Sequence, residues 1–145
     1  MIVERHHDGY LISTDPTRLD IDTIHSWISE RSYWAKGRTR ATTESAIATS
    51  LNFGVYTADG IMVGAARVVG DGVTFAWICD VFVLDAHRGS GIGKALMETV
   101  VAHPAVVDVK RVALATGDAH GLYSRYGFEV LDTPERWMIR RGSIL

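Results

Sequence analysis

The sequence predicts an α/β fold of the α+β type, in which helices flank a mixed and mostly antiparallel sheet. Three runs of strand-forming residues, 53–57, 61–69 and 75–84, follow one another through short glycine-containing turns, and this order is typical of an antiparallel meander. A helical pattern then leads to a further apolar run at 111–116, and strands on either side of such a helix lie parallel. The length suits one domain, residues 1–145.

The N-terminal part of the chain predicts a short strand and a first helix. Residues 10–13 have strand composition, and a proline soon after them ends whatever precedes the next element. Isoleucines then recur on one face over residues 21–31, behind Asp20 or Asp22 as the capping residue. We therefore expect an amphipathic helix of about three turns.

Residues 32–40 combine aromatic and cationic side chains and predict a loop. Two interpretations remain open: a solvated connector with Trp34 tucked into the core, or a rim of a substrate site, since loops on a rigid scaffold often determine specificity. A second helix is expected to begin at Thr42 or Thr43 and to keep Leu51 on its apolar side.

The C-terminal part predicts one more helix and two strands. A short helix follows Asp118 and ends at Gly127, where glycine is the usual residue after a helix. A strand then begins at Phe128, and residues 137–140 predict the last strand.

The stretch 80–94 is the most informative for function. The run 75–84 predicts a strand buried on both faces, with Asp80 as its one charge. A glycine turn at the start of the next helix follows it: Arg88, Gly89, Ser90, Gly91, Ile92, Gly93 and Lys94. Unpaired N–H groups and the helix dipole attract anions there, and glycine permits their close approach. The turn therefore predicts a phosphate or pyrophosphate site, although a glycine turn without a ligand is the alternative.

Spacing excludes two common nucleotide motifs. A Walker A loop needs Gly-x-x-x-x-Gly-Lys-Ser/Thr, but Arg88 and Ala95 stand at its first and last positions. A dinucleotide motif needs Gly-x-Gly-x-x-Gly, but its last position is Lys94 or Leu96. Neither an ATP loop nor a dinucleotide fold is expected.

Two linked motifs instead resemble a known superfamily. Arg88, Gly91 and Gly93 fit Arg-x-x-Gly-x-Gly, and residues 122–128, Leu-Tyr-Ser-Arg-Tyr-Gly-Phe, fit the pattern Phe/Leu-Tyr-x-x-x-Gly-Phe. In both motifs and their order the chain resembles the GNAT superfamily of acetyl-CoA-dependent N-acetyltransferases. Its Asp-Ala-His-Gly-Leu-Tyr run is similar to that of a bacterial subgroup. Thr116 departs from the family pattern, which often has Asn there.

The resemblance implies a GNAT-like sheet whose central strands splay around CoA, and it implies roles for particular residues. Acetyl-CoA is the implied co-substrate, bound by the glycine turn and by the backbone N–H groups of Val81, Phe82 and Val83. Tyr123 is implied as the general acid for the leaving thiolate. The general base stays open between Asp80, His120 and water. Asp80 is equally consistent with a structural carboxylate that pairs with Arg67.

The implied reaction is direct transfer of an acetyl group from acetyl-CoA to an amine in a ternary complex. The acceptor is a small-molecule or protein amine, and a homodimer is possible. The alternative is a catalytically silent module that senses acyl-CoA. Retention of Tyr123 favours the enzyme.

Composition excludes several other classes. The chain is 47% hydrophobic and 22% charged with a formal charge of −2, which predicts a globular protein without the basic field that nucleic acid requires. No run is long enough to span a membrane and no leader is recognised, so we expect a cytoplasmic protein. Cys79 stands alone, and His6 and His7 lack a third ligand, so neither a disulfide nor a metal site is expected.

Overall fold

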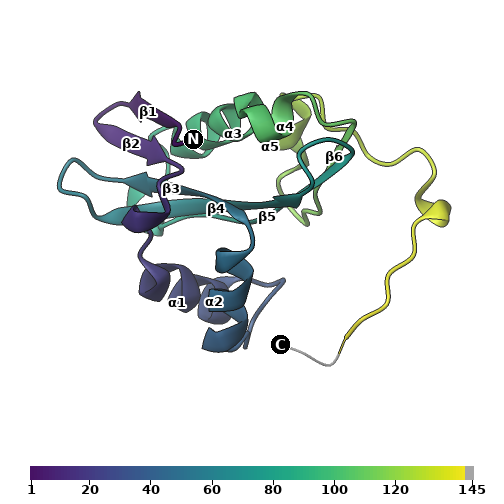
Figure 1. Cartoon of the computed structure of the whole chain (residues 1–145), viewed down its shortest axis with the longest axis horizontal. Helices are drawn as coiled ribbons and strands as arrows, with labels where there is room; N and C mark the ends of the chain where they lie inside the picture. Colours follow the sequence, from purple (N-terminus) through teal and green to yellow (C-terminus); the bar gives the residue numbers. More distant parts are fainter. Residues whose placement is uncertain (143–145) are drawn as a thin grey trace.

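The structure is a computed structural model and describes residues 1–142 (Figure 1). Its strands are β1 Glu4–His7, β2 Tyr10–Ser13, β3 Leu51–Tyr56, β4 Met62–Gly70, β5 Phe75–Val83 and β6 Arg111–Ala113. Its α-helices are α1 Ile21–Arg31, α2 Arg40–Ala48, α3 Ile92–Ala102, α4 Pro104–Val107 and α5 His120–Ser124. Short 3-10 helices are η1 Pro16–Arg18, η2 Asp85–His87 and η3 Pro134–Arg136.

The six strands form one sheet in the order β1-β2-β3-β4-β5-β6. Every neighbouring pair is antiparallel except β5 and β6, which are parallel. Helices α3, α4 and α5 cover one face of the sheet, and α1 and α2 cover the other (Figure 1). The predicted mixed, mostly antiparallel sheet between helices is confirmed.

A hydrophobic core lies on each face of the sheet. On one face, Leu96 and Val100 of α3 pack against Phe53 and Ile78. On the other, Ile28 of α1 belongs to a smaller cluster with Tyr56, Met62, Ala65 and Phe82. Because the two cores fix α1 and α3 on opposite faces, the end of β5 lies between them.

Strands β5 and β6 separate soon after they begin to pair. Their register joins Phe75, Ala76 and Trp77 to residues 111–113 and goes no further, while β5 continues to Val83. The predicted strand over 111–116 is therefore shorter than expected. Residues 78–83 have a sheet neighbour in β4 only, which leaves the backbone groups on their other edge open.

A β-bulge at Asp80 changes which face its side chain occupies. The β4–β5 register shifts between Ala65 and Arg67, and Asp80 has a φ of 51°, a left-handed conformation that Asp adopts more readily than most residues. Regular strand alternation predicts that the neighbours Cys79 and Asp80 point to opposite faces. Arg67 pairs with Cys79 and also binds Asp80, so that prediction is wrong here. The extra residue in β5 breaks the simple alternation.

Burial along β5 is also less complete than predicted. Trp77 is 37% exposed and Cys79 is half-buried, so β5 is not buried on both faces. Ala76 and Ile78 belong to the core beneath α3, so the alternating residues Trp77 and Cys79 lie on the opposite face of the sheet.

The two ends of the chain depart most from the predictions. Residues 4–7, among them His6 and His7, form β1 and pair with β2, although the sequence predicted no strand there. The predicted strands from Phe128 and over 137–140 are wrong, because the segment from 128 to 142 contains only η3 and extends away from the sheet without a strand partner (Figure 1).

The second helix also differs from its prediction. It starts after Thr39, which is its N-cap, and Leu51 belongs to β3 instead of to this helix. None of the described helices is long and apolar enough to cross a membrane.

Candidate active site

A pocket of about 550 Å³ opens where β5 and β6 separate. Its walls come from the end of β5, the glycine turn, the start of α5 and the connection between α1 and α2. Most of the predicted site residues line it: Val81, Phe82, Val83, Arg88, Gly89, Gly91, Ile92, Gly93 and Tyr123. The sheet, the turn and α5 are thus brought together as the sequence motifs predict.

The glycine turn leaves the N-terminus of α3 open. Gly91 occupies the N-cap position with a φ of 74°, and α3 has no side-chain cap. By contrast, Asp20 caps α1 and Thr39 caps α2. A Cβ on Gly93 would meet nothing within 4 Å. The first-turn N–H groups of α3 are therefore accessible and suit an anion such as the pyrophosphate of CoA.

Two histidine contacts hold this turn against the N-terminal hairpin. Nε2 of His7 lies 3.1 Å from the carbonyl oxygen of Ser90, and the hydroxyl of Tyr10 lies 2.8 Å from Nδ1 of His87. The sequence analysis missed both, because residues about eighty positions apart form them and leave no local pattern.

Of the two cations predicted to bind phosphate, Arg88 lines the pocket and Lys94 does not. Arg88 lines the pocket, donates from Nε to the carbonyl oxygen of Val83 at 3.1 Å, and pairs with Asp85. Lys94 and Ser90 do not belong to the pocket lining. Both side chains are exposed.

Tyr123 is the buried phenol of the pocket. It is 9% exposed, its ring packs edge-on to Phe128 at 6.0 Å, and no group within residues 1–142 forms a hydrogen bond with its hydroxyl. Burial raises the pKa of Tyr123, and Tyr33 and Asp118 raise it further. The phenol therefore keeps its proton at neutral pH, as a general acid requires.

Comparison with known proteins identifies the family. The sequence model of the acetyltransferase (GNAT) domain matches residues 49–130, more than half of the chain. The chain belongs to the GNAT acetyltransferase family. A candidate acetyltransferase from Gibberella zeae is 30% identical, over 80% of this chain and 76% of that protein.

Solved structures agree with this assignment. A candidate GNAT-family acetyltransferase from Xanthomonas campestris pv. campestris is 46% identical with a TM-score of 0.90, covering 94% of this chain and 96% of that one. A candidate acetyltransferase from Clostridium acetobutylicum, solved with acetyl-CoA, shares the fold at 15% identity and a TM-score of 0.63, covering 97% of this chain and 96% of that one.

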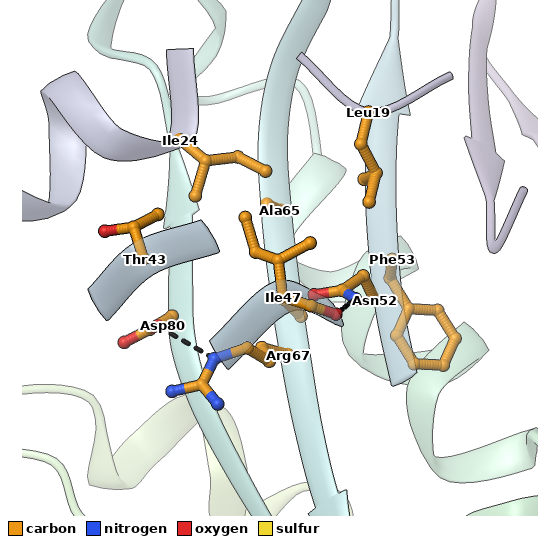
Figure 2. Close-up of a pocket in the computed structure, with 10 residues that line it drawn as sticks. Leu19, Ile24, Thr43, Ile47, Asn52, Phe53, Ala65, Arg67 and Asp80 are labelled. Carbon is orange, nitrogen blue, oxygen red and sulfur yellow. Dashed lines mark hydrogen bonds and ion pairs between the residues drawn. The ribbon is translucent and has the colours of Figure 1, made fainter. Parts of the chain in front are cut away.

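In this acetyltransferase, Asp80 lies beneath α2 and outside the pocket lining. Its carboxylate accepts hydrogen bonds from Nη1 of Arg38 at 2.7 Å, Nε of Arg67 at 3.0 Å and Nε1 of Trp34 at 3.0 Å. Figure 2 shows the contact between Asp80 and Arg67, with Thr43 and Ile47 of α2 close to it. The space between these side chains is about 10 Å³, enough for one water at most.

These contacts also determine the charge of Asp80. Burial alone would raise its pKa, but the hydrogen bond from Arg38 and the charge of Arg67 outweigh burial and hold the pKa below its ordinary value. A carboxylate so stabilised is a weak base. The geometry favours the structural interpretation of Asp80 that the sequence left open.

The connection between α1 and α2 supplies residues that the sequence analysis did not place in the site. Tyr33 and Trp34 line the pocket with Trp27 of α1. The Tyr33 hydroxyl accepts a hydrogen bond from the backbone N–H of Gly117 at 2.7 Å. The aromatic composition of residues 32–40 was the available signal, and the interpretation of this loop as a rim of the site is the one that the structure supports.

The other titratable candidates lie apart from the pocket. His120 begins α5, is exposed and does not line the pocket. Burial raises the pKa of the Cys79 thiol to about 11, which makes it a poor nucleophile. Within residues 1–142, no three metal-binding side chains gather in one place.

Proposed function

We propose that this acetyltransferase transfers the acetyl group of acetyl-CoA to a primary amine within a ternary complex. The observation that supports this most is the position of Tyr123, a buried phenol without a hydrogen-bond partner in the described chain, in the same pocket as the uncapped N-terminus of α3. A site that only bound acyl-CoA would need the turn but not the phenol.

The donor is proposed to lie along the open edge of β5. The pyrophosphate meets the first-turn N–H groups of α3, with Arg88 and Lys94 as cationic partners. The pantetheine arm follows residues 81–83, whose alternate N–H groups face the gap left by β6. One of these N–H groups polarises the thioester carbonyl, because it points to where negative charge develops.

Transfer then needs two proton movements. The neutral amine attacks the carbonyl carbon, the C–N bond forms, and the C–S bond breaks. Tyr123 donates its proton to the departing thiolate, and the proton lost by the amine nitrogen returns to the Tyr123 phenolate through water. Asp80 takes no part in this sequence and acts as a positioning residue for the α1–α2 connection.

A homodimer is proposed on the basis of the C-terminal arm, residues 129–142. Val130, Met138 and Ile139 are 78%, 96% and 79% exposed, and the outer edge of β6 pairs with no strand of residues 1–142. Open edges and exposed apolar side chains together favour association. The double substitution Met138→Lys and Ile139→Lys should convert a dimer to a monomer in multi-angle light scattering, and an unchanged mass would contradict this surface.

An acceptor screen tests the function. Free CoA release from acetyl-CoA is followed with a panel of amines, and acetyl-CoA binding is followed in parallel by thermal shift, with ATP and NAD as controls. Ligand at about 100 times its dissociation constant should add about 2.7 kcal/mol of stability. Amine-dependent CoA release supports the enzyme; binding without release from any amine favours the acyl-CoA sensor.

A further inference from the structure

The pocket of about 550 Å³ has two chemically different halves. The donor half consists of the glycine turn and the open edge of β5, which the proposed function assigns to acetyl-CoA. The acceptor half faces it and is lined by Trp27, Tyr33 and Trp34, with Phe82 beneath them and Asp118 at the margin.

Its aromatic side chains form one continuous surface, which we name the aromatic wall: Trp27, Tyr33, Trp34 and Phe82. Trp27 stacks on Phe82 with a centroid distance of 4.7 Å and an angle of 10°. Trp34 lies 5.6 Å from Trp27, and Tyr33 is edge-on to Trp34 at 5.1 Å. Tyr33 and Trp34 remain 63% and 42% exposed, so ring surface is available to a ligand.

Contacts at both ends hold the aromatic wall in place. Trp34 donates to Asp80 on β5, and Tyr33 accepts from Gly117 in the segment that follows β6. The α1–α2 connection therefore spans the two strands that separate around the pocket. A wall fixed in this way loses little conformational freedom when a flat ligand binds.

The charges near the pocket are mostly paired. Arg31 and Arg88 both contact Asp85, and Arg38 and Arg67 contact Asp80. Asp118 is different, because its carboxylate has no ion-pair partner within residues 1–142. It stands at the pocket margin one residue before the N-cap of α5, which places a negative charge on the acceptor half.

We propose that the acceptor is an aromatic primary amine, with its ring on the aromatic wall and its ammonium group at Asp118. This inference rests on the proposed acetyl transfer and specifies its substrate class. Aromatic faces attract other rings and the positive charge of an ammonium group. Asp118 holds the ammonium until its proton passes to water and the neutral amine attacks the thioester. Polyamines and peptide lysines lack the flat group that the wall accommodates.

The first experiment compares amines of matched reach. With acetyl-CoA saturating, kcat/KM is measured for 2-phenylethylamine, n-hexylamine, spermidine and a lysine peptide. The proposal predicts that 2-phenylethylamine exceeds each of the others by roughly fivefold to tenfold. A preference for spermidine or the peptide overturns the aromatic acceptor while leaving acetyl transfer intact. Absence of CoA release with every amine is instead a failure of the proposed function.

Variants separate the two contacts. Tyr33→Leu and Trp34→Leu should raise KM for 2-phenylethylamine by roughly tenfold, with the dissociation constant of acetyl-CoA unchanged. Asp118→Asn should weaken 2-phenylethylamine but not its uncharged analogue 2-phenylethanol, measured as a competitive inhibitor. Trp77→Leu is the matched control, because Trp77 is a partly exposed indole on β5 outside the pocket lining. An unchanged KM in both wall variants, or equal weakening of the amine and the alcohol by Asp118→Asn, would contradict the assignment.

Discussion

Arg38 and Asp80 form a buried ion pair in which Nη1 of Arg38 lies 2.7 Å from Oδ2 of Asp80. Arg38 belongs to the connection between α1 and α2, and Asp80 is the bulged residue of β5. Both side chains are largely buried, at 15% and 6% exposure. The pair thus joins the loop that lines the acceptor half to the strand that is proposed to bind the donor.

Asp80→Asn should therefore affect stability and acceptor binding together. The amide keeps the shape of the side chain but leaves two buried guanidinium groups without their counterion, and loss of one partner from a buried pair costs about 3 kcal/mol. Chemical denaturation should show this loss, and kinetics should show a raised KM for the amine with acetyl-CoA affinity unchanged. If Asp80 were instead the general base, turnover at saturating substrates would collapse while stability changed little.

Asp85→Asn is the matched control for that experiment. Asp85 also pairs with an arginine, Arg31, but both side chains are 56% exposed. Exposed pairs contribute little to stability, so this variant should unfold at the same denaturant concentration as the unmodified protein.

Gly93→Ala and Gly91→Ala should have opposite effects on the stability of the free protein. Gly93 is a helical residue with open space at its Cβ position, so alanine should stabilise by about 1 kcal/mol. Gly91 has a left-handed conformation, so alanine there should cost about 1 kcal/mol. Both should weaken acetyl-CoA binding by roughly tenfold, about the value of one hydrogen bond to a charged group.

Calorimetric titration of acetyl-CoA measures this effect. Gly121→Ala, a helical glycine of α5 outside the pocket lining, is the control and should bind acetyl-CoA normally. Normal binding by both turn variants would show that the glycine turn is not part of the donor site.

The local parts of this site could be predicted from the sequence. The glycine turn and the α5 segment are each continuous stretches, and their conformations follow from short-range rules: Gly91 in a left-handed N-cap and Gly127 with a φ of 85° after α5. The runs of strand-forming residues, the short turns between them and the order of elements likewise predicted the mixed sheet.

The acceptor half could not be predicted in the same way. The contacts Trp34–Asp80 and Tyr33–Gly117 join residues 46 and 84 positions apart, and no local pattern encodes such pairs. The bulge at Asp80 is equally invisible, because it follows from how β4 and β5 pair and not from the composition of β5. The C-terminal strands were wrong for the converse reason: residues with strand composition at 128–140 pair with no strand of residues 1–142, although the outer edge of β6 is open.

His103 should make stability depend on pH in mildly acidic solution. It is 6% exposed, and its Nδ1 accepts a hydrogen bond from the backbone N–H of Ala105 at the start of α4. Burial lowers the pKa of His103 in the folded state from its ordinary 6.5. Below about pH 6.5 the unfolded chain binds a proton at this histidine before the folded chain does. The free energy of unfolding should therefore decrease as the pH decreases, by up to about 1.4 kcal/mol per pH unit.

His103→Asn isolates this contribution. Asparagine can accept the same hydrogen bond from Ala105 but cannot be charged, so the free energy of unfolding should change little as the pH falls below about 6.5. A variant that keeps the full slope would assign the pH dependence to another group.

Turnover of Tyr123→Phe at saturating acetyl-CoA and amine tests the central claim most directly. The substitution keeps the ring and its packing against Phe128 but removes the proton that the thiolate needs. We predict a fall in kcat of about 10²-fold or more, with acetyl-CoA affinity and melting temperature close to those of the unmodified protein. An undiminished kcat in Tyr123→Phe would contradict the assignment of Tyr123 as the general acid of acetyl transfer.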